Sequence, residues 1–222
     1  MKTGYFFKNY FLLFMLSCIN LMCFHEKPAK EVEVISHQTA QNSNHALQIL
    51  SLKKKAKNGD LVTRTGNDFT SQSLKTLNRR NKTFSHCGIV HIENDTVFVY
   101  HALGGEWNPN QKLRKDPFEE FADPVSNNLI GLFRYNLPRK ELHKMVEVAD
   151  SLYQIAIPFD MDFSLDTKDK MYCAEFVLYC LQEASPLLSD LPLSQINDFI
   201  FVGVDDLFLQ KICEPVGVIK YR

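Results

Sequence analysis

Hydrophobic residues alternate with polar residues in several short segments of the chain, and in other segments they recur every three or four positions. The first pattern is typical of strands and the second of amphipathic helices. The strand pattern predicts strands at residues 60–64, 85–92, 96–103, 129–135 and 216–221. The helical spacing predicts helices at residues 46–57, 71–81, 117–122, 138–155 and 170–184. Because the strands at 85–92 and 96–103 flank a short turn and helices lie between the strands, we expect an α+β fold with an antiparallel sheet packed against helices.

The first 24 residues have the pattern of an export signal. Lys2 and Lys8 accompany an apolar stretch that is shorter than the ~20 residues needed to span a bilayer. Met15-Leu16-Ser17-Cys18 resembles a bacterial lipobox, in which the cysteine becomes the lipidated first residue of the mature protein. A plain cleaved signal, in which Cys18 is incidental, is the alternative. We expect a signal peptide over residues 1–17, a polar tether over 18–45 and one globular domain over 46–222. The protein would then be an exported lipoprotein of the bacterial cell envelope, in the periplasm or at the outer membrane, held to the membrane by its lipid.

Composition narrows the possible partners. The chain has 222 residues and a net charge of -1, and no stripe of lysine and arginine is interleaved with aromatic side chains. We therefore expect no nucleic-acid partner. Six cysteines are present, so lipidation of Cys18 would leave an odd number in an oxidising compartment. At least one thiol then has no partner, which suits a free nucleophile without proving one.

Cys173 lies near the start of the predicted helix 170–184. It shares an apolar stripe with Cys180, so a purely structural core cysteine is the plain alternative for Cys173, and Cys180 is interpreted as core. Asp169 or Thr167 is expected to cap the helix, which places Cys173 in or near its first turn. The unpaired N–H groups and the helix dipole at this end favour a thiolate, the nucleophilic form of cysteine.

Two histidines lie on the two strands of the predicted hairpin. Strand alternation places His86 and Gly88 on one face and Cys87 on the other, so we interpret Cys87 as structural. Gly88 is expected to let a helix approach the strand closely. His101 ends the second strand and is either a surface histidine or the group that orients His86. Because a regular strand does not direct His86, Cys87 and His91 to one point, we expect no metal site.

Four motifs together resemble the circularly permuted branch of the NlpC-type papain-like enzymes, and within it the YiiX/YebB-like proteins. They are Gly59-Asp60-Leu61-Val62, Ser85-His86-Cys87-Gly88-Ile89-Val90, Tyr100-His101-Ala102 and Tyr172-Cys173-Ala174-Glu175-Phe176-Val177. The resemblance implies a permuted papain-like fold with Cys173 as nucleophile, His86 as base and His101 as the third polar residue, and it implies no cofactor. Two positions depart from the family pattern. Ala174 replaces a serine that commonly follows the cysteine, and His101 stands where near relatives often carry glutamate.

Three functions remain open from the sequence. The first is an exported cysteine hydrolase that cleaves an amide bond in a peptide, a peptidoglycan stem or an acyl amide. The second is an acyltransferase or lipid-amide hydrolase resembling the lecithin:retinol acyltransferase-like enzymes. A histidine at the third position resembles both these enzymes and the cell-wall peptidases. The third is a catalytically silent binding module of the envelope. The loops at residues 104–115 and 158–168 are expected to determine specificity.

Overall fold

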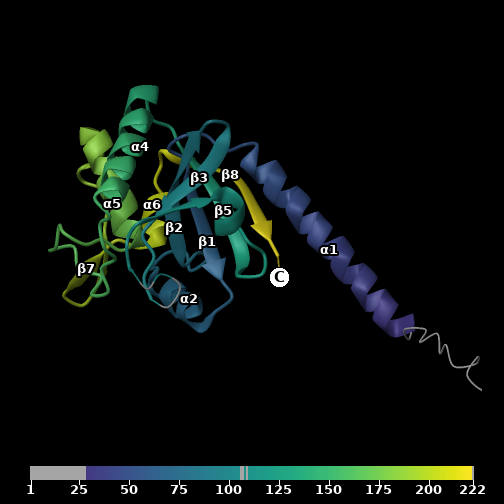
Figure 1. The fold of residues 1–222 in the computed structure, drawn as a ribbon. Helices are drawn as coiled ribbons and strands as arrows, with labels where there is room; N and C mark the ends of the chain where they lie inside the picture. Colours follow the sequence, from purple (N-terminus) through teal and green to yellow (C-terminus); the bar gives the residue numbers. More distant parts are fainter. Residues whose placement is uncertain (1–28, 106–107, 109, 222) are drawn as a thin grey trace, which may run out of the picture. The chain divides into compact units, whose positions relative to one another are not determined.

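The computed structural model describes residues 29–105, 108 and 110–221 (Figure 1). The chain divides into two compact units, residues 1–42 and 43–222, and helix α1 (Ala29–Lys53) contains the boundary between them. The predicted signal peptide, Cys18 and the first part of the predicted tether lie outside the described residues. Among the helices that the structure describes, none is both long enough and apolar enough to cross a membrane.

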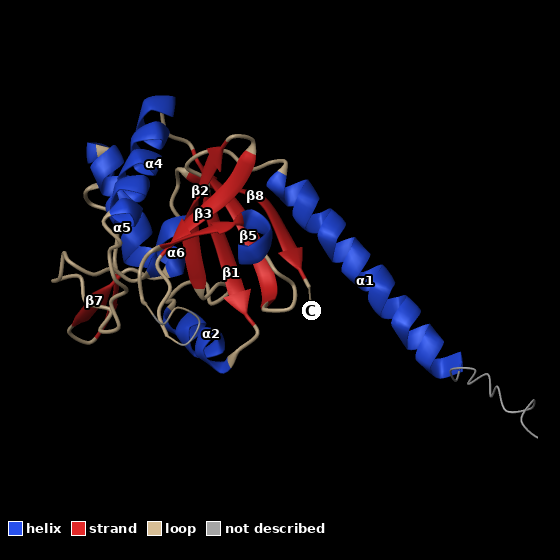
Figure 2. Ribbon diagram, in the orientation of Figure 1, coloured by secondary structure: helices blue, strands red, loops and turns tan. Residues whose placement is uncertain are grey.

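In the described part of the chain, six strands form one antiparallel sheet with the order β4-β3-β2-β1-β5-β8 (Figure 2). These strands are β1 (Leu61–Gly66), β2 (His86–Glu93), β3 (Thr96–His101), β4 (Arg114–Pro117), β5 (Asn127–Tyr135) and β8 (Cys213–Lys220). A separate small hairpin pairs β6 (Ser194–Ile196) with β7 (Phe199–Phe201). The predicted α+β fold with an antiparallel sheet is confirmed.

Helices cover both faces of the sheet. The longer ones, α4 (Arg139–Gln154) and α5 (Cys173–Ala184), lie beside each other on one face (Figure 1). The other face is covered by α3 (Phe118–Phe121) and by the end of α1. Two further helices, α2 (Phe69–Leu74) and α6 (Val204–Phe208), are short. Helix α2 continues into a 3₁₀ turn at Lys75–Leu77, and a second 3₁₀ turn spans Pro186–Leu188.

The alternation of side chains along β2 produces the two layers. Cys87 and Ile89 pack in the core cluster that contains α5, whereas Val90 packs with Phe118 and Phe121 of α3 in the second cluster. The β2–β3 hairpin turns at Asn94 and Asp95, whose φ angles of 47° and 61° are left-handed. A two-residue turn with both φ values positive matches the natural twist of paired strands, so it fixes the register that brings the ends of β2 and β3 together.

Several elements differ from the sequence prediction. Helix α1 begins at Ala29, because residues 29–45 lack apolar periodicity but include Ala, Glu, Lys and Gln, which favour helix on their own. Helix α5 begins at Cys173 rather than at residue 170. The predicted helix 71–81 is replaced by the shorter α2 and its 3₁₀ turn. Strand β4 begins inside the predicted loop 104–115. All four of its residues are charged or proline, so only its pairing with β3 reveals the strand.

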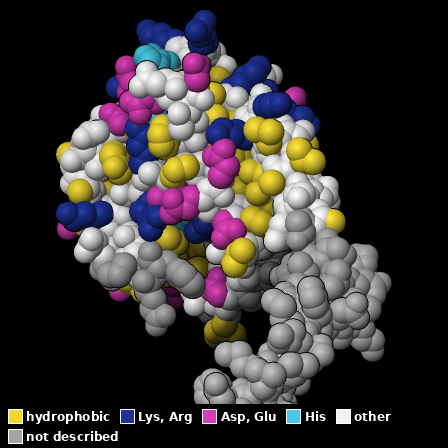
Figure 3. Space-filling model, turned by 45° about the vertical axis from the view of Figure 1, so that its right-hand side comes forward, with side chains coloured by type: hydrophobic (Ala, Val, Ile, Leu, Met, Phe, Trp, Pro, Cys, Tyr) yellow, Lys and Arg dark blue, Asp and Glu magenta, His cyan; other side chains and the backbone are white. Residues whose placement is uncertain are grey.

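Acidic and basic side chains are mixed over the face of the molecule that Figure 3 shows. This mixture agrees with the net charge of -1. Electrostatic steering of a polyanion requires an extended surface of positive charge. The face shown in Figure 3 has no such surface.

Candidate active site

Cys173 is the first residue of α5. Tyr172 precedes it as the N-cap with extended backbone angles, and Glu175 Oε2 accepts a hydrogen bond from the Tyr172 N–H at 3.2 Å. The Tyr172 hydroxyl in turn accepts from the Val202 N–H at 2.8 Å. The expected caps Asp169 and Thr167 are therefore wrong, because the helix starts later and Glu175 closes its first turn. Cys173 lies at the positive end of the helix dipole, as the thiolate argument requires.

The loop before α5, residues 155–172, is held together by hydrogen bonds and an ion pair around Asp160. Asp160 is fully buried, and its carboxylate accepts hydrogen bonds from the N–H groups of Asp162 and Ser164, both at 2.9 Å. Lys170 Nζ forms an ion pair with the same carboxylate at 2.9 Å. A carboxylate with donors on three sides holds the loop in one conformation, and the loop thereby fixes the position at which α5 begins.

His86 is the first residue of β2, and its ring contacts both candidate partners. Its Nε2 lies 2.8 Å from Nδ1 of His101. The ring also interacts with Cys173, whose thiolate raises the pKa of His86. Because Nε2 is engaged by His101, the ring nitrogen left for the sulfur is Nδ1. The structure thus brings Cys173, His86 and His101 into one connected set of side chains.

Gly88 creates the space for this contact. A Cβ atom at residue 88 would lie 2.6 Å from the Tyr100 carbonyl oxygen and 3.0 Å from Cβ of His101. The expectation that Gly88 admits a helix is therefore wrong. The close neighbour is β3, and the missing side chain lets His101 sit beside the strand and reach the His86 ring.

Sequence reasoning missed a fourth polar residue, Asp116 on β4. Its Oδ2 lies 2.9 Å from His101 Nε2, and Arg114 Nε donates to both carboxylate oxygens at 3.0 and 2.9 Å. Only the tertiary structure identifies Asp116, because β4 shows no apolar alternation in the sequence. The strand joins the site through its pairing with β3, in which Arg114 lies opposite His101. Strands β2, β3 and β4 thus carry a continuous row of hydrogen-bonded side chains.

Phe121 covers this row from α3. Its ring stacks on His86 with a centroid distance of 5.8 Å and meets His101 edge-on at 5.2 Å. The guanidinium of Arg64, which pairs across from His86 on β1, lies 4.6 Å from the centroid of the same ring. The two imidazoles are therefore screened from water on this side, which strengthens the hydrogen bonds between them.

Burial governs the charges of the two histidines. Loss of hydration lowers the pKa of His86 to about 4 and that of His101 to about 4. Cys173 opposes the effect on His86, because a neighbouring thiolate favours the imidazolium. Cys173 and His86 thus compete for one proton, and the pair titrates together. For the sulfur, the surrounding groups favour the thiolate, and the pKa of Cys173 lies well below its usual value.

Cys87 makes the largest contribution to that low pKa. Its side chain is hydrogen-bonded to Cys173, and this bond outweighs the opposing effect of burial on Cys173. Burial raises the pKa of Cys87 itself well above the usual value, so Cys87 keeps its proton and acts as the donor. The interpretation of Cys87 as structural is incomplete, because the side chain also touches the candidate nucleophile.

We expect Cys87→Ala to make Cys173 less acidic. A hydrogen bond to a charged group is worth about 1.5–3 kcal/mol, which corresponds to an upward shift of about 1–2 units in the pKa of Cys173. The measurement is the pH dependence of iodoacetamide alkylation at Cys173, followed by peptide mass spectrometry. Cys180→Ala is the matched control, because it removes a fully buried thiol from the same helix without touching the site. An unchanged midpoint in Cys87→Ala would contradict the donor role.

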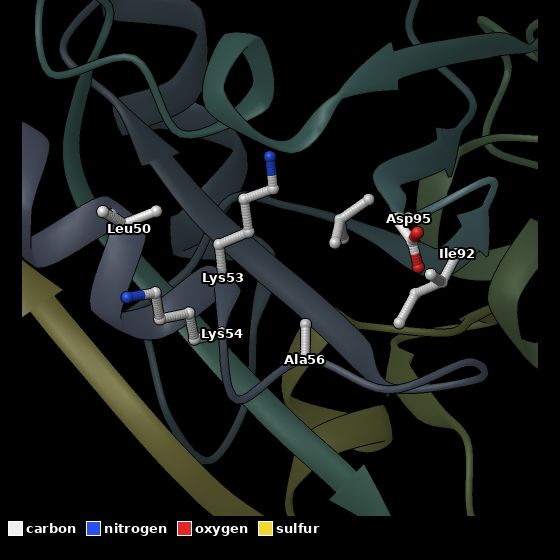
Figure 4. A pocket seen from close by; sticks show the side chains of 7 residues that line it. Leu50, Lys53, Lys54, Ala56, Ile92 and Asp95 are labelled. Carbon is white, nitrogen blue, oxygen red and sulfur yellow. The ribbon is translucent and has the colours of Figure 1, made fainter.

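Other features of the described residues lie away from this set. No group of three or more His, Cys, Asp or Glu side chains there is arranged to hold a metal ion. A hollow of about 260 Å³ at the end of α1 is shown in Figure 4. Its lining consists of Leu50, Lys53, Lys54, Ala56, Ile92, Asp95 and Val97. A second hollow of about 320 Å³ lies around Arg134. Neither includes Cys173, His86 or His101.

A family model described as "Permuted papain-like amidase enzyme, YaeF/YiiX, C92 family" matches residues 55–191. Among solved structures, the fold is similar to that of the metalloprotein yiiX from Escherichia coli O157:H7, with a TM-score of 0.56 and 18% sequence identity. This alignment covers 73% of the present chain and 97% of the other, and at such low identity it shows the fold alone. No curated protein matches the sequence.

Proposed function

The chain belongs to the C92 family of permuted papain-like amidases, and we propose that it cleaves an amide bond through Cys173, His86 and His101. Family membership makes it a cysteine amidase or peptidase in general. One observation carries the assignment of residues. Cys173 begins a helix and interacts electrostatically with His86, whose Nε2 lies 2.8 Å from Nδ1 of His101. Nucleophile, base and orienting group are thereby joined in the order that thiol catalysis needs.

The reaction follows from this order. Sγ of Cys173 attacks the carbonyl carbon while Nδ1 of His86 holds the thiol proton. The oxyanion accepts a hydrogen bond from the Cys173 N–H, which is unpaired at the helix start. When the C–N bond breaks, His86 gives its proton to the departing amine and a thioester remains. Water then attacks the thioester with His86 as base, which releases the acid and restores the thiol.

The substrate we favour is a peptide or a peptidoglycan-stem amide, and acyl amides are the main rival. Support comes from the export pattern of the first 24 residues, which would place the enzyme in the cell envelope. A histidine as third residue resembles both the cell-wall peptidases and the acyltransferase-like enzymes, so transfer of the acyl group to a second substrate is the competing reaction.

4-Nitrophenyl acetate distinguishes these reactions, because its activated ester needs no specific pocket. We expect rapid nitrophenol release followed by steady hydrolysis to acetate, with no change in products when ethanolamine is added. Formation of N-acetylethanolamine as the main product would favour the transferase. Absence of nitrophenol release above the buffer rate, in a folded protein, would favour the silent module and contradict the proposed function.

We also propose that Cys18 carries lipid and anchors the protein to a membrane of the cell envelope. The support is the charged start, the short apolar core and the motif Met15-Leu16-Ser17-Cys18. Mass spectrometry of the N-terminal peptide, from protein isolated out of bacterial membranes, is expected to show a diacylglyceryl group on Cys18 as the first residue. An unmodified peptide that begins beyond Cys18 would contradict the anchor.

A further inference from the structure

We propose that Asp116 is a positioning residue of this site, which acts through both imidazole rings to keep hydrogen off the His86 nitrogen that faces Cys173. The inference rests on the proposed function for its catalytic consequence, but the proton arrangement itself follows from hydrogen-bond geometry. Asp116 never touches the sulfur, and its influence passes along the row from β4 through β3 to β2.

The row has only two links, and both are short. Asp116 Oδ2 lies 2.9 Å from His101 Nε2, and His101 Nδ1 lies 2.8 Å from His86 Nε2. His101 is fully buried, while Asp116 and His86 are each 8% exposed. Water therefore has little access to these nitrogens, and each must find its partner within the row.

The carboxylate sets the direction of every hydrogen bond. An ionised carboxylate only accepts, so His101 Nε2 must carry a hydrogen and donate it. Burial keeps His101 neutral near pH 7, so its single hydrogen is used and Nδ1 is a bare acceptor. His86 Nε2 must then carry the hydrogen that Nδ1 of His101 accepts. A neutral His86 consequently has a bare Nδ1, which is the nitrogen able to take the proton of Cys173.

Asp116 remains ionised because cations and donors surround it. Burial by itself would raise the pKa of Asp116, but the hydrogen bonds from His101 and Arg114 outweigh burial and hold it at about 2. Arg114 from the same strand is also paired with Glu120 of α3 at 2.9 Å. Arg64 on β1 contributes further positive charge from across the sheet. Asp116 is therefore ionised near pH 7 and acts only as a hydrogen-bond acceptor for His101.

An amide at residue 116 would reverse the direction of both hydrogen bonds in the row. Arg114 donates to Oδ1 from both Nε and its terminal nitrogen, so the carbonyl oxygen of an asparagine fits best at that position. The NH₂ group would then face His101 and donate to Nε2. His101 would carry its hydrogen on Nδ1 and donate it to His86 Nε2, which leaves the His86 hydrogen on Nδ1, against the sulfur. That tautomer cannot accept the thiol proton.

Histidine-selective ¹H–¹⁵N spectroscopy of the full chain tests this arrangement directly. In the unsubstituted protein we expect His86 and His101 both to carry hydrogen on Nε2 near pH 7. In Asp116→Asn we expect both to carry it on Nδ1, and we expect 4-nitrophenyl acetate turnover to fall by about 100-fold or more, since a wrong tautomer disables a general base. Glu120→Gln is the matched control, because it removes a charge from the other partner of Arg114 and should leave tautomers and turnover unchanged.

The outcomes separate this inference from the proposed function. A His86 ring in the unsubstituted protein that carries hydrogen on Nδ1 and none on Nε2 would overturn the inference even if Asp116→Asn failed to fold. Unchanged tautomers in a folded Asp116→Asn protein would also overturn it. The expected tautomers in a protein that does not turn over the ester would support the role of Asp116 and count against the proposed function instead.

Discussion

Cys173→Ala is expected to abolish turnover of 4-nitrophenyl acetate and of the natural amide. Without the sulfur no thioester forms, and a helix start with one oxyanion donor offers little catalysis by itself. Loss of the nucleophile in comparable triads costs about 10⁴-fold or more in kcat. The measurement is steady-state nitrophenol release, with circular dichroism to show that the variant is folded. Cys180→Ala is the control, since Cys180 lies in the same helix and is fully buried in the core.

Cys173→Ser refines this test. The hydroxyl retains the shape of the side chain, but its proton is far harder to remove, so the hydrogen bond from Cys87 and the helix dipole cannot produce an anion. We expect only trace activity in this variant. Turnover near the unsubstituted rate in either Cys173 variant would show that another residue attacks the carbonyl.

His86→Asn is expected to produce the second largest effect. The amide is similar in size to the imidazole but takes no proton, so thiol activation and protonation of the leaving group are both lost. General acid–base catalysis is worth about 10²–10⁴-fold, and we expect turnover to fall by that amount. Alkylation of Cys173 by iodoacetamide near pH 7 is expected to slow as well, since the neighbouring imidazole favours the thiolate.

His91→Asn is the matched control for this variant. His91 lies on the same strand, five residues after His86. Because side chains alternate along a strand, His91 points to the opposite face, where its ring stacks on Tyr100 with a centroid distance of 5.5 Å. Replacement of His91 should leave turnover and alkylation close to those of the unsubstituted protein. Equal losses in the two variants would indicate a general effect on β2 rather than a base at residue 86.

Local sequence signals predicted the parts of the site that local physics determines. The turn between β2 and β3 needs two left-handed residues, and Asn94 and Asp95 provide them. The hairpin then places His86 near His101, as strand alternation indicates. Cys173 at a helix start was also visible, although Glu175 rather than an upstream residue closes the first turn. The resemblance to the permuted papain-like enzymes is confirmed by the family match.

The missing parts depend on contacts between distant segments. Asp116 lies in the site because β4 pairs with β3. The residues of Arg114–Pro117 have low intrinsic strand propensity, so the sequence does not predict this strand. Cys87 contacts Cys173 because α5 packs on β2, although strand alternation correctly places Cys87 on the face opposite Gly88. Register and helix packing are properties of the whole fold, so a pattern read along the chain cannot reveal these contacts.

The mass of the acyl-enzyme tests the central claim most directly. The full chain is mixed with 4-nitrophenyl acetate, quenched with acid during the initial phase, and analysed by intact and peptide mass spectrometry. Our account predicts one acetyl group, located on Cys173, which disappears as hydrolysis proceeds and is absent from Cys173→Ala. Acetylation of a different residue that turns over at the catalytic rate, or turnover with Cys173 unmodified throughout, would contradict the account.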